Sequence, residues 1–163
     1  MNINDFFTQN HIEFTEVDEK KKDIVQLVIF KLANEEYAVD VSQVVEIKKI
    51  TTITRVPKAK SYFIGVINLR GSVIPIVDFK KIINVSPTQS ENSNRIIILK
   101  INKIMFGIVV DSVSEVVDMD KEDIEDAGKI DLDLEKKYIS GIGKYNNRLL
   151  IILNLMKIAE STN

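Results

Sequence analysis

Cysteine and tryptophan are absent from the 163 residues, and histidine occurs once, as His11. A chain without cysteine forms no disulfide, no thiolate metal site and no thiol nucleophile. A Ser–His–Asp triad would have to recruit His11, which lies in a polar stretch rather than a packed frame. The six glycines make no phosphate loop, because Tyr138 stands where the first glycine of a motif ending at Gly143-Lys144 belongs. We therefore expect a protein that is not an enzyme and needs no cofactor or metal.

Charge and hydropathy also give little sign of a nucleic-acid or membrane partner. The 22 basic and 24 acidic residues leave a formal charge of −2, which attracts neither nucleic acid nor an anionic membrane over long range. No apolar run reaches the 18 or so residues that a membrane span needs. Asn2, Asn4 and Asp5 stand where a signal peptide carries basic residues. The sequence predicts a soluble cytoplasmic protein without direct membrane insertion.

A polar arm, residues 1–23, precedes the part of the chain that is expected to fold, and a helix over Asp5–Glu13 is compatible with its sequence. From Ile24 onward, short runs rich in Val, Ile and Leu alternate with turn residues, which is typical of strands. The expected strands are Ile24–Leu32, Glu36–Val41, Phe63–Leu69, Ser72–Phe79, Arg95–Ile101, Met105–Val110 and Arg148–Leu155. Pro75 inside one run suggests a sheet edge or a bulge. A last helical turn is expected around Leu155–Glu160.

Internal repetition is the most informative pattern in the chain. Residues 30–47 align with 99–116 at an offset of 69, and residues 62–82 align with 138–158 at an offset of 76. The apolar positions agree almost throughout, so one half is a diverged copy of the other. We expect an all-β fold of two similar small barrels packed together over residues 24–158. The first half would cover about 24–84 and the second about 94–158, with a boundary that need not be continuous in sequence, and 159–163 form the C-terminal end.

A local basic stretch leaves one alternative open. Lys48, Lys49, Arg55, Lys58 and Lys60 precede two aromatic residues, and small barrels that bind single-stranded nucleic acid combine a basic groove with aromatic platforms. The balanced total charge favours ordinary surface lysines over this second candidate function. The acidic stretch 111–135, with eleven carboxylates, likewise fits a solvated surface.

Four motifs in order resemble those of CheW-family domains, over about Val25 to Ile158. They are Glu36–Val41 with Val44–Ile47, Gly65–Gly71 with Val73–Asp78, Gly107–Asp111 with Val113–Val116, and Tyr138–Gly143. This resemblance implies two five-stranded barrels of the Src-homology-3-like kind. It implies an adaptor of bacterial chemotaxis whose partners are the regulatory domain of the histidine kinase CheA and the cytoplasmic tip of methyl-accepting chemoreceptors. Ring assembly and recruitment to receptor arrays are part of the same expectation.

The resemblance also implies candidate partner-binding residues. Arg70 falls on the arginine of the central motif, which is implicated in receptor coupling, and Val44 and Glu46 fall on positions associated with partner contact. Arg70-Gly71 equally fits a hairpin turn in which Gly71 takes a positive φ, although we favour a functional role for Arg70. Asn68 completes the candidate set and fits a turn hydrogen bond.

Two of these residues have structural alternatives of equal weight. Val44 recurs as Val113, which fits core packing as well as partner contact. Glu46 recurs as Glu115, which fits either an ion pair shared by both barrels or a partner site. For the kinase-binding face, Arg148 and the stretch Asp111–Glu115 are guesses only.

Overall fold

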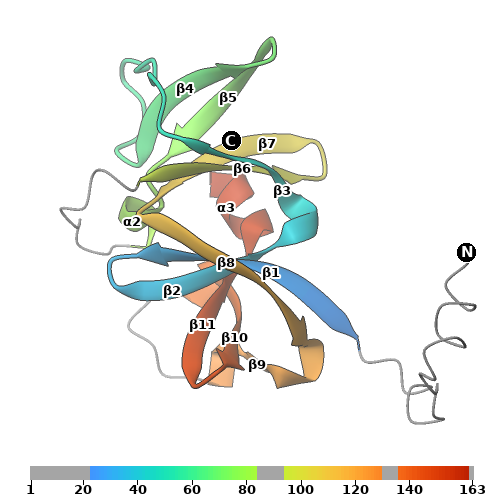
Figure 1. Cartoon of the computed structure of the whole chain (residues 1–163). Coiled ribbons are helices and arrows are strands. Elements are labelled where there is room, and N and C mark those ends of the chain that lie inside the picture. Colours follow the sequence, from blue (N-terminus) through green and yellow to red (C-terminus); the bar gives the residue numbers. More distant parts are fainter. Residues whose placement is uncertain (1–22, 84–93, 130–135, 162–163) are drawn as a thin grey trace, which may run out of the picture.

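The computed structural model describes residues 23–83, 94–129 and 136–161. Within them the chain forms eleven strands in two sheets, with two short α-helices and four 3-10 turns (Figure 1). The helix expected over Asp5–Glu13 and nearly all of the loop expected from Asn84 to Asn94 lie outside the described residues.

The first sheet has six strands, and only its β2–β11 pair is parallel. Its strands, in spatial order, are β8 (Ser112–Asp120), β1 (Ile24–Leu32), β2 (Glu35–Asp40), β11 (Arg148–Leu153), β10 (Ile139–Tyr145) and β9 (Ile124–Asp126).

The second sheet has five strands, and only its β5–β7 pair is parallel. Its strands, in spatial order, are β3 (Val44–Lys49), β6 (Arg95–Ile101), β7 (Ile104–Val110), β5 (Ser72–Val77) and β4 (Phe63–Leu69). The β4–β5 hairpin forms one end of the molecule and β9 lies at the other (Figure 1).

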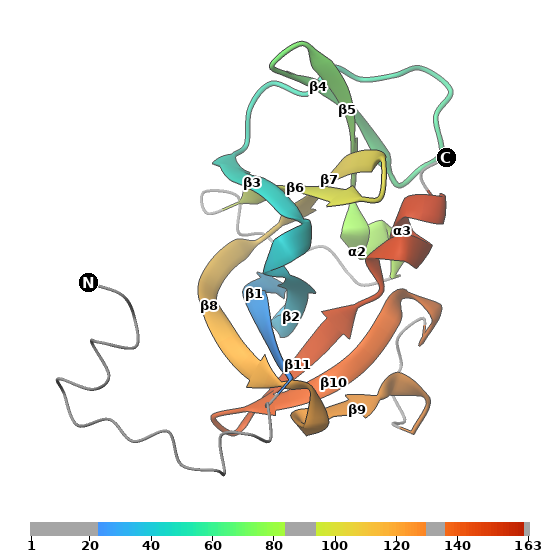
Figure 2. The ribbon, with the colours of Figure 1, turned by 90° about the vertical axis from the view of Figure 1, so that its right-hand side faces the viewer.

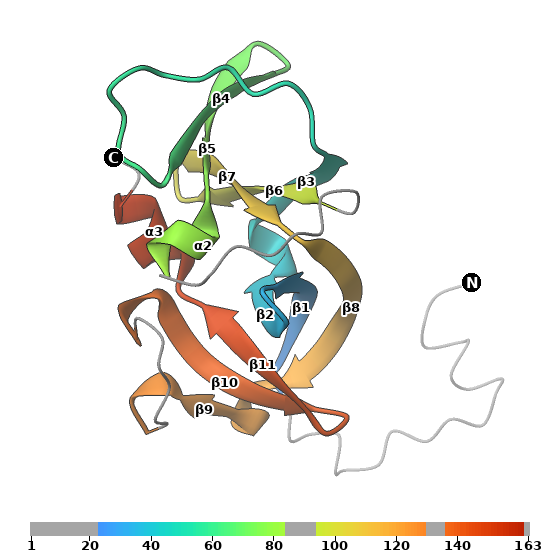
Figure 3. The same ribbon diagram turned by 90° about the vertical axis from the view of Figure 1, so that its left-hand side faces the viewer.

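The two α-helices, α2 (Phe79–Ile82) and α3 (Leu155–Ser161), lie between the sheets (Figures 2 and 3). Each follows a capping side chain: Asp78 accepts the N–H of Lys80 at 3.1 Å, and Asn154 accepts the N–H of Lys157 at 3.2 Å. The 3-10 turns are η2 (Val41–Gln43), η3 (Lys121–Asp123), η4 (Ala127–Lys129) and η5 (Lys136–Tyr138).

The sequence repeat is visible in the sheets, but the two copies have exchanged hairpins. The β1–β2 hairpin of the first copy pairs with β8 and β11 of the second, and the β6–β7 hairpin of the second copy pairs with β3 and β5 of the first. With the offsets of 69 and 76, the order β8-β1-β2-β11-β10 maps strand by strand onto β3-β6-β7-β5-β4. Neither sheet is therefore made from one continuous half of the chain.

The repeat extends to registers and irregularities. The parallel pairs Ile76↔Gly107 and Ile152↔Ala38 are equivalent. The β4–β5 and β10–β11 pairs also share a shift in pairing register, which falls just before the equivalent glycines Gly65 and Gly141. A Cβ at Gly65 would lie 2.2 Å from the carbonyl oxygen of Thr54, so only glycine permits this close backbone approach.

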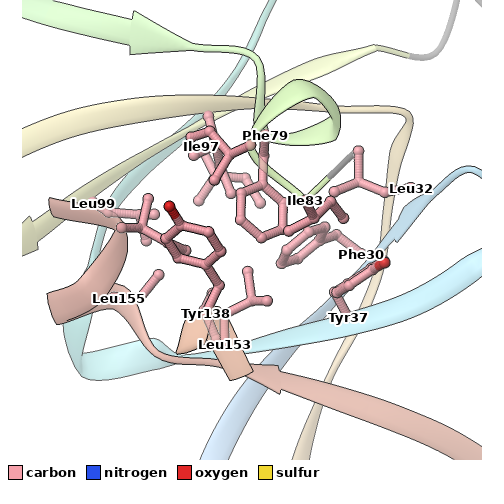
Figure 4. Packing of buried hydrophobic residues seen from close by; sticks show 14 of the residues in the cluster. Phe30, Leu32, Tyr37, Phe79, Ile83, Ile97, Leu99, Tyr138, Leu153 and Leu155 are labelled. Atoms are coloured by element: carbon pink, nitrogen blue, oxygen red, sulfur yellow. The ribbon is translucent and has the colours of Figure 1, made fainter. Parts of the chain in front are cut away.

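The main hydrophobic core lies where the two sheets meet, and both sheets and both helices contribute to it (Figure 4). Tyr37 stacks on Phe30 at 5.9 Å between ring centroids and meets Phe79 of α2 edge-on at 6.0 Å. Smaller clusters sit on each sheet separately. Burial of a side chain such as Phe79 contributes about 1.5–3 kcal/mol, so the shared core binds the two halves into one unit.

The all-β fold with two similar Src-homology-3-like parts is confirmed, and so are the final helix and the strands predicted from apolar runs. The parts differ from two closed five-stranded barrels. One sheet gains β9 as a sixth strand, and among the described residues the first and last strands of each sheet are not hydrogen-bonded to each other. For Pro75 the sequence suggests an edge or a bulge: β5 is not an edge strand, since it lies between β4 and β7, but the β4–β5 ladder has an irregularity opposite the neighbouring Ile76, and pairing with β7 begins only at Ile76.

Candidate partner-binding site

Three of the five candidate residues shape the turn between β4 and β5. Arg70 and Gly71 are its central residues, with φ of 50° and 87°, and two successive positive φ angles are typical of a type I′ turn. The Oδ1 atom of Asn68 accepts the backbone N–H of Gly71 at 2.9 Å. The turn hydrogen bond expected of Asn68 is present, and the turn carries the Arg70 side chain at its tip.

Glu46 joins this turn through an ion pair. The Nη2 atom of Arg70 lies 3.3 Å from the Oε2 atom of Glu46, and the side chains are 76% and 29% exposed. Such an exposed pair contributes about 0–1 kcal/mol, so its main effect is to hold the guanidinium in one orientation. Glu46 takes one of five N–H donors, which leaves a planar donor group suited to carboxylates of a partner.

Val44 is oriented differently from the other candidates. It is half-buried, lies opposite Leu99 of β6 and packs against the main core cluster. The described contacts of Val44 are therefore those of a packing residue, which makes its candidate role indirect.

A second charged group occupies the equivalent part of the six-stranded sheet. Arg148, at the start of β11, donates hydrogen bonds to Glu115 of β8 and, at 3.3 Å, to Glu36 of β2. Its guanidinium also lies 5.6 Å from the ring centroid of Tyr145. The hydrogen bond that Arg148 donates to Glu115 is the main reason that the pKa of Arg148 lies above its ordinary value.

Exposed apolar residues stand near both charged groups in the sequence, at matching positions of the repeat. Ile47 in β3 is 40% exposed, and its repeat counterpart Val116 in β8 is 52% exposed. Val73 in β5 is 67% exposed, and its counterpart Leu149 in β11 is 51% exposed. A single exposed apolar residue is ordinary, but two equivalent groups of them point to contact surfaces. We call these groups the first set (Glu46, Ile47, Arg70, Val73) and the second set (Glu115, Val116, Arg148, Leu149).

A partly buried ion pair that sequence reasoning missed links the two sheets. The Nζ atom of Lys80 in α2 lies 2.5 Å from Oδ1 of Asp111, and each side chain is only 13% exposed. The other carboxylate oxygen of Asp111 accepts the N–H of Ala33 in the β1–β2 turn at 2.9 Å. The pair therefore ties the helix that follows β5 of the five-stranded sheet to the β1–β2 hairpin of the six-stranded sheet.

The pKa of Tyr37 is also shifted, and the cause is burial of its phenol rather than pairing with a catalytic group. Burial raises the pKa of Tyr37 to about 12, with a smaller contribution from Glu35. This phenol lies in the main core with its oxygen unpartnered among the described residues, so its shift marks a packing position and not an acid or base at a site.

Two like sheets with exchanged hairpins, carrying two equivalent surface sets, define a two-part β domain of the Src-homology-3-like kind with the surface of a protein-binding module. The chain belongs to the CheW family: residues 26–163 match the model of the CheW-like domain. The family resemblance stated from the motifs is thereby confirmed.

Individual relatives agree with this assignment. The chemotaxis protein CheW of Bacillus subtilis is 36% identical over 83% of this chain and 86% of its own length, and that of Klebsiella aerogenes is 32% identical over 83% and 82%. The crystal structure of the scaffolding protein TtCheW from Thermoanaerobacter tengcongensis superposes with a TM-score of 0.76 at 34% identity, covering 80% of this chain and 84% of that one. These names describe chemotaxis and scaffolding proteins and give no support to the nucleic-acid alternative.

The helices of the described residues are short. α2 has four residues and α3 has seven, so neither is long and apolar enough to cross a membrane.

Proposed function

We propose that this protein is a non-enzymatic adaptor of bacterial chemotaxis, which couples transmembrane chemoreceptors to the regulatory domain of the histidine kinase CheA. It acts in the cytoplasm, at receptor arrays on the inner face of the membrane. The family membership and the chemotaxis and scaffolding names of the relatives support this proposal.

The observation that carries the proposal is the presence of two equivalent surface sets on two sheets that share one core. An adaptor must hold two partners at once, and a duplicated fold with a shared core offers two separate docking positions. In an array, several weak contacts made together give firm attachment, so neither set needs a large interface.

Within this proposal, Arg70 and Glu46 belong to the receptor-facing surface. Their pair is exposed and contributes little to folding. Arg70→Glu places two carboxylates side by side, so it should leave the unfolding midpoint nearly unchanged and weaken docking of a receptor signalling fragment about tenfold or more. Co-sedimentation with receptor-containing membranes measures this effect, and undiminished docking would remove Arg70 from the site.

The first experiment is a calorimetric titration of the full chain against the isolated regulatory domain of CheA. We expect a saturable one-to-one complex that tolerates moderate salt, because exposed apolar residues supply part of the contact. No binding at high micromolar concentration would leave the fold standing and overturn the partnership.

Val73→Glu and Leu149→Glu are matched variants that separate the two surface sets. Both residues are exposed and equivalent in the repeat, so the folding cost should be similar and small. A charge in the centre of an apolar contact should raise the dissociation constant about tenfold or more. At least one variant should do so, and full binding by both would show that neither set touches the kinase domain.

A further inference from the structure

A cleft of about 520 Å³ lies at the junction of the two halves, and none of its lining residues belongs to either surface set. Its floor is apolar and comes from the six-stranded sheet, with Leu27 of β1 and Ile152 of β11. Its other walls come from the β6–β7 turn and from the start of α3, which Figure 2 shows between the five-stranded sheet and β11. A volume of this size accommodates one or two aromatic side chains with neighbouring backbone.

The repeat shows why this position is open. Leu155 and Met156 line the cleft, and their counterparts in the first copy are Phe79 and Lys80. There the phenylalanine ring is fully buried and the lysine ammonium is paired with Asp111. The equivalent position is thus filled by an aromatic ring and a satisfied charge, and the smaller, uncharged residues of the second copy leave that space unfilled.

The rim chemistry of the cleft favours an acidic occupant. Lys100 and Lys121 line it and Asp40 is the one carboxylate among its described lining residues. The side chain of Asp40 is already engaged, since its Oδ1 atom accepts both the N–H and the hydroxyl of Ser42. Lys121 is already paired with the Asp23 carboxylate at 3.5 Å, and an apolar floor beside Lys100 and this pair fits a peptide that presents aromatic rings beside carboxylates.

The chain itself carries such a segment beside the cleft. Residues 1–19 hold five carboxylates with no lysine or arginine, and Phe6, Phe7 and Phe14 are three of the seven phenylalanines. The described chain begins at the rim: Val25 lines the cleft, and Asp23 bonds to Lys121 through its backbone oxygen at 2.9 Å and its carboxylate at 3.5 Å.

We propose that residues 5–14 of the same chain occupy this cleft, with the Phe6-Phe7 pair on the apolar floor and the acidic side chains facing Lys100 and Lys121. The nine residues from Phe14 to Asp23 span up to roughly 30 Å when extended, so the tether does not limit the reach. A short tether also gives an effective concentration of about the millimolar range, and weak contacts then suffice.

The absence of cysteine permits a direct test on the full chain. A nitroxide on Asn10→Cys, the only thiol, should broaden the backbone amide signals of Asn102, Ser140 and Met156 around the cleft and spare that of Gly71 at the far hairpin. The same label with Phe6→Ser and Phe7→Ser should reduce broadening at the cleft to the level of Gly71. Equal broadening everywhere, or broadening that survives the serine substitutions, overturns the proposal.

A charge control and a mixing control complete the test. Lys100→Glu should weaken the effect, whereas Lys103→Glu, three residues further on in the β6–β7 turn and not lining the cleft, should not; equal responses overturn the assigned contacts. Spin-labelled chain of natural isotope abundance mixed with unlabelled, nitrogen-15-enriched chain should give no broadening. Broadening in that mixture would assign the cleft to the arm of a second copy and overturn docking within one chain.

Discussion

Lys80 and Met156 occupy equivalent positions in the two copies of the repeat, one residue into α2 and α3. Lys80 reaches the carboxylate of Asp111, which also holds the β1–β2 turn. Met156 has no such partner to reach, because Ser42 stands at the position equivalent to Asp111, and it lines an open cleft instead. One junction between the halves is therefore locked by charge while the other is left accessible.

The contrast shows which parts of a duplicated fold can diverge. Core positions keep their character, as with Ile82 and Ile158, because each is packed from several sides. Junction and surface positions can change in pairs, as Lys80 with Asp111 did, provided that no buried charge loses its partner. Such paired changes make one half of a symmetric frame different from the other, which the proposed adaptor role with two partners would require.

The largest expected effect on stability comes from giving the junction held by Lys80 and Asp111 the residues of the junction at Met156. Lys80→Met leaves Asp111 partly buried without its cation and should lower the free energy of unfolding by about 3 kcal/mol. Lys80→Met combined with Asp111→Ser copies both residues of the second junction and should recover at least half of that loss, since no charge is left unpaired. Urea unfolding of the three proteins measures both values. A double variant as unstable as the single one would contradict the explanation by charge.

The next comparison concerns Tyr37 and its counterpart Phe106, both buried in the main core. The Tyr37 hydroxyl has no partner among the described residues, so Tyr37→Phe should be neutral or stabilise by up to about 1 kcal/mol. The pKa of about 12 adds a pH dependence. Because this folded value exceeds the ordinary 10.0 of the unfolded chain, the stability linked to the phenol proton is complete below pH 10 and is lost as the pH rises toward 12.

Thermal or urea unfolding of wild type and Tyr37→Phe between pH 9 and about pH 11 tests this point. The wild type should lose stability relative to the variant only above pH 10, since the other ionising groups are common to both proteins. A constant difference across this range would show that the Tyr37 phenol titrates normally.

Continuous apolar runs made much of the fold predictable from the sequence. The predicted bounds Ile24–Leu32, Phe63–Leu69 and Arg95–Ile101 coincide with β1, β4 and β6, because each of these strands contributes buried apolar side chains to a core cluster. β3 and β8 were not predicted as separate strands, since their outer faces alternate with charged or polar residues. The exchange of hairpins left no local signal, because β1–β2 and β6–β7 have the same pattern and fit either sheet equally well.

The candidate site was predictable only where its residues are neighbours in sequence. Asn68, Arg70 and Gly71 form one turn, and turn chemistry identified it. The network of Arg148 could not be found in the same way, because its partner Glu36 lies 112 residues away and meets it only through the exchanged hairpin. The Lys80–Asp111 pair, across two halves, depends on the same exchange.

The smallest expected effect compares the arginines of the two surface sets. Arg70→Ala removes one exposed contact and should change the free energy of unfolding by no more than about 0.5 kcal/mol. Arg148→Ala should cost more at low salt, because it leaves Glu36 and Glu115 facing each other without a cation. Raising the ionic strength toward 1 M shortens the screening length to about 3 Å and should bring the two variants together. Adding Glu36→Gln to Arg148→Ala should restore part of the loss at low salt only. The contrary result is that Arg70→Ala and Arg148→Ala lower the free energy of unfolding equally at every salt concentration. That result would mean that the two carboxylates around Arg148 stabilise the fold no more than the single Arg70–Glu46 pair does.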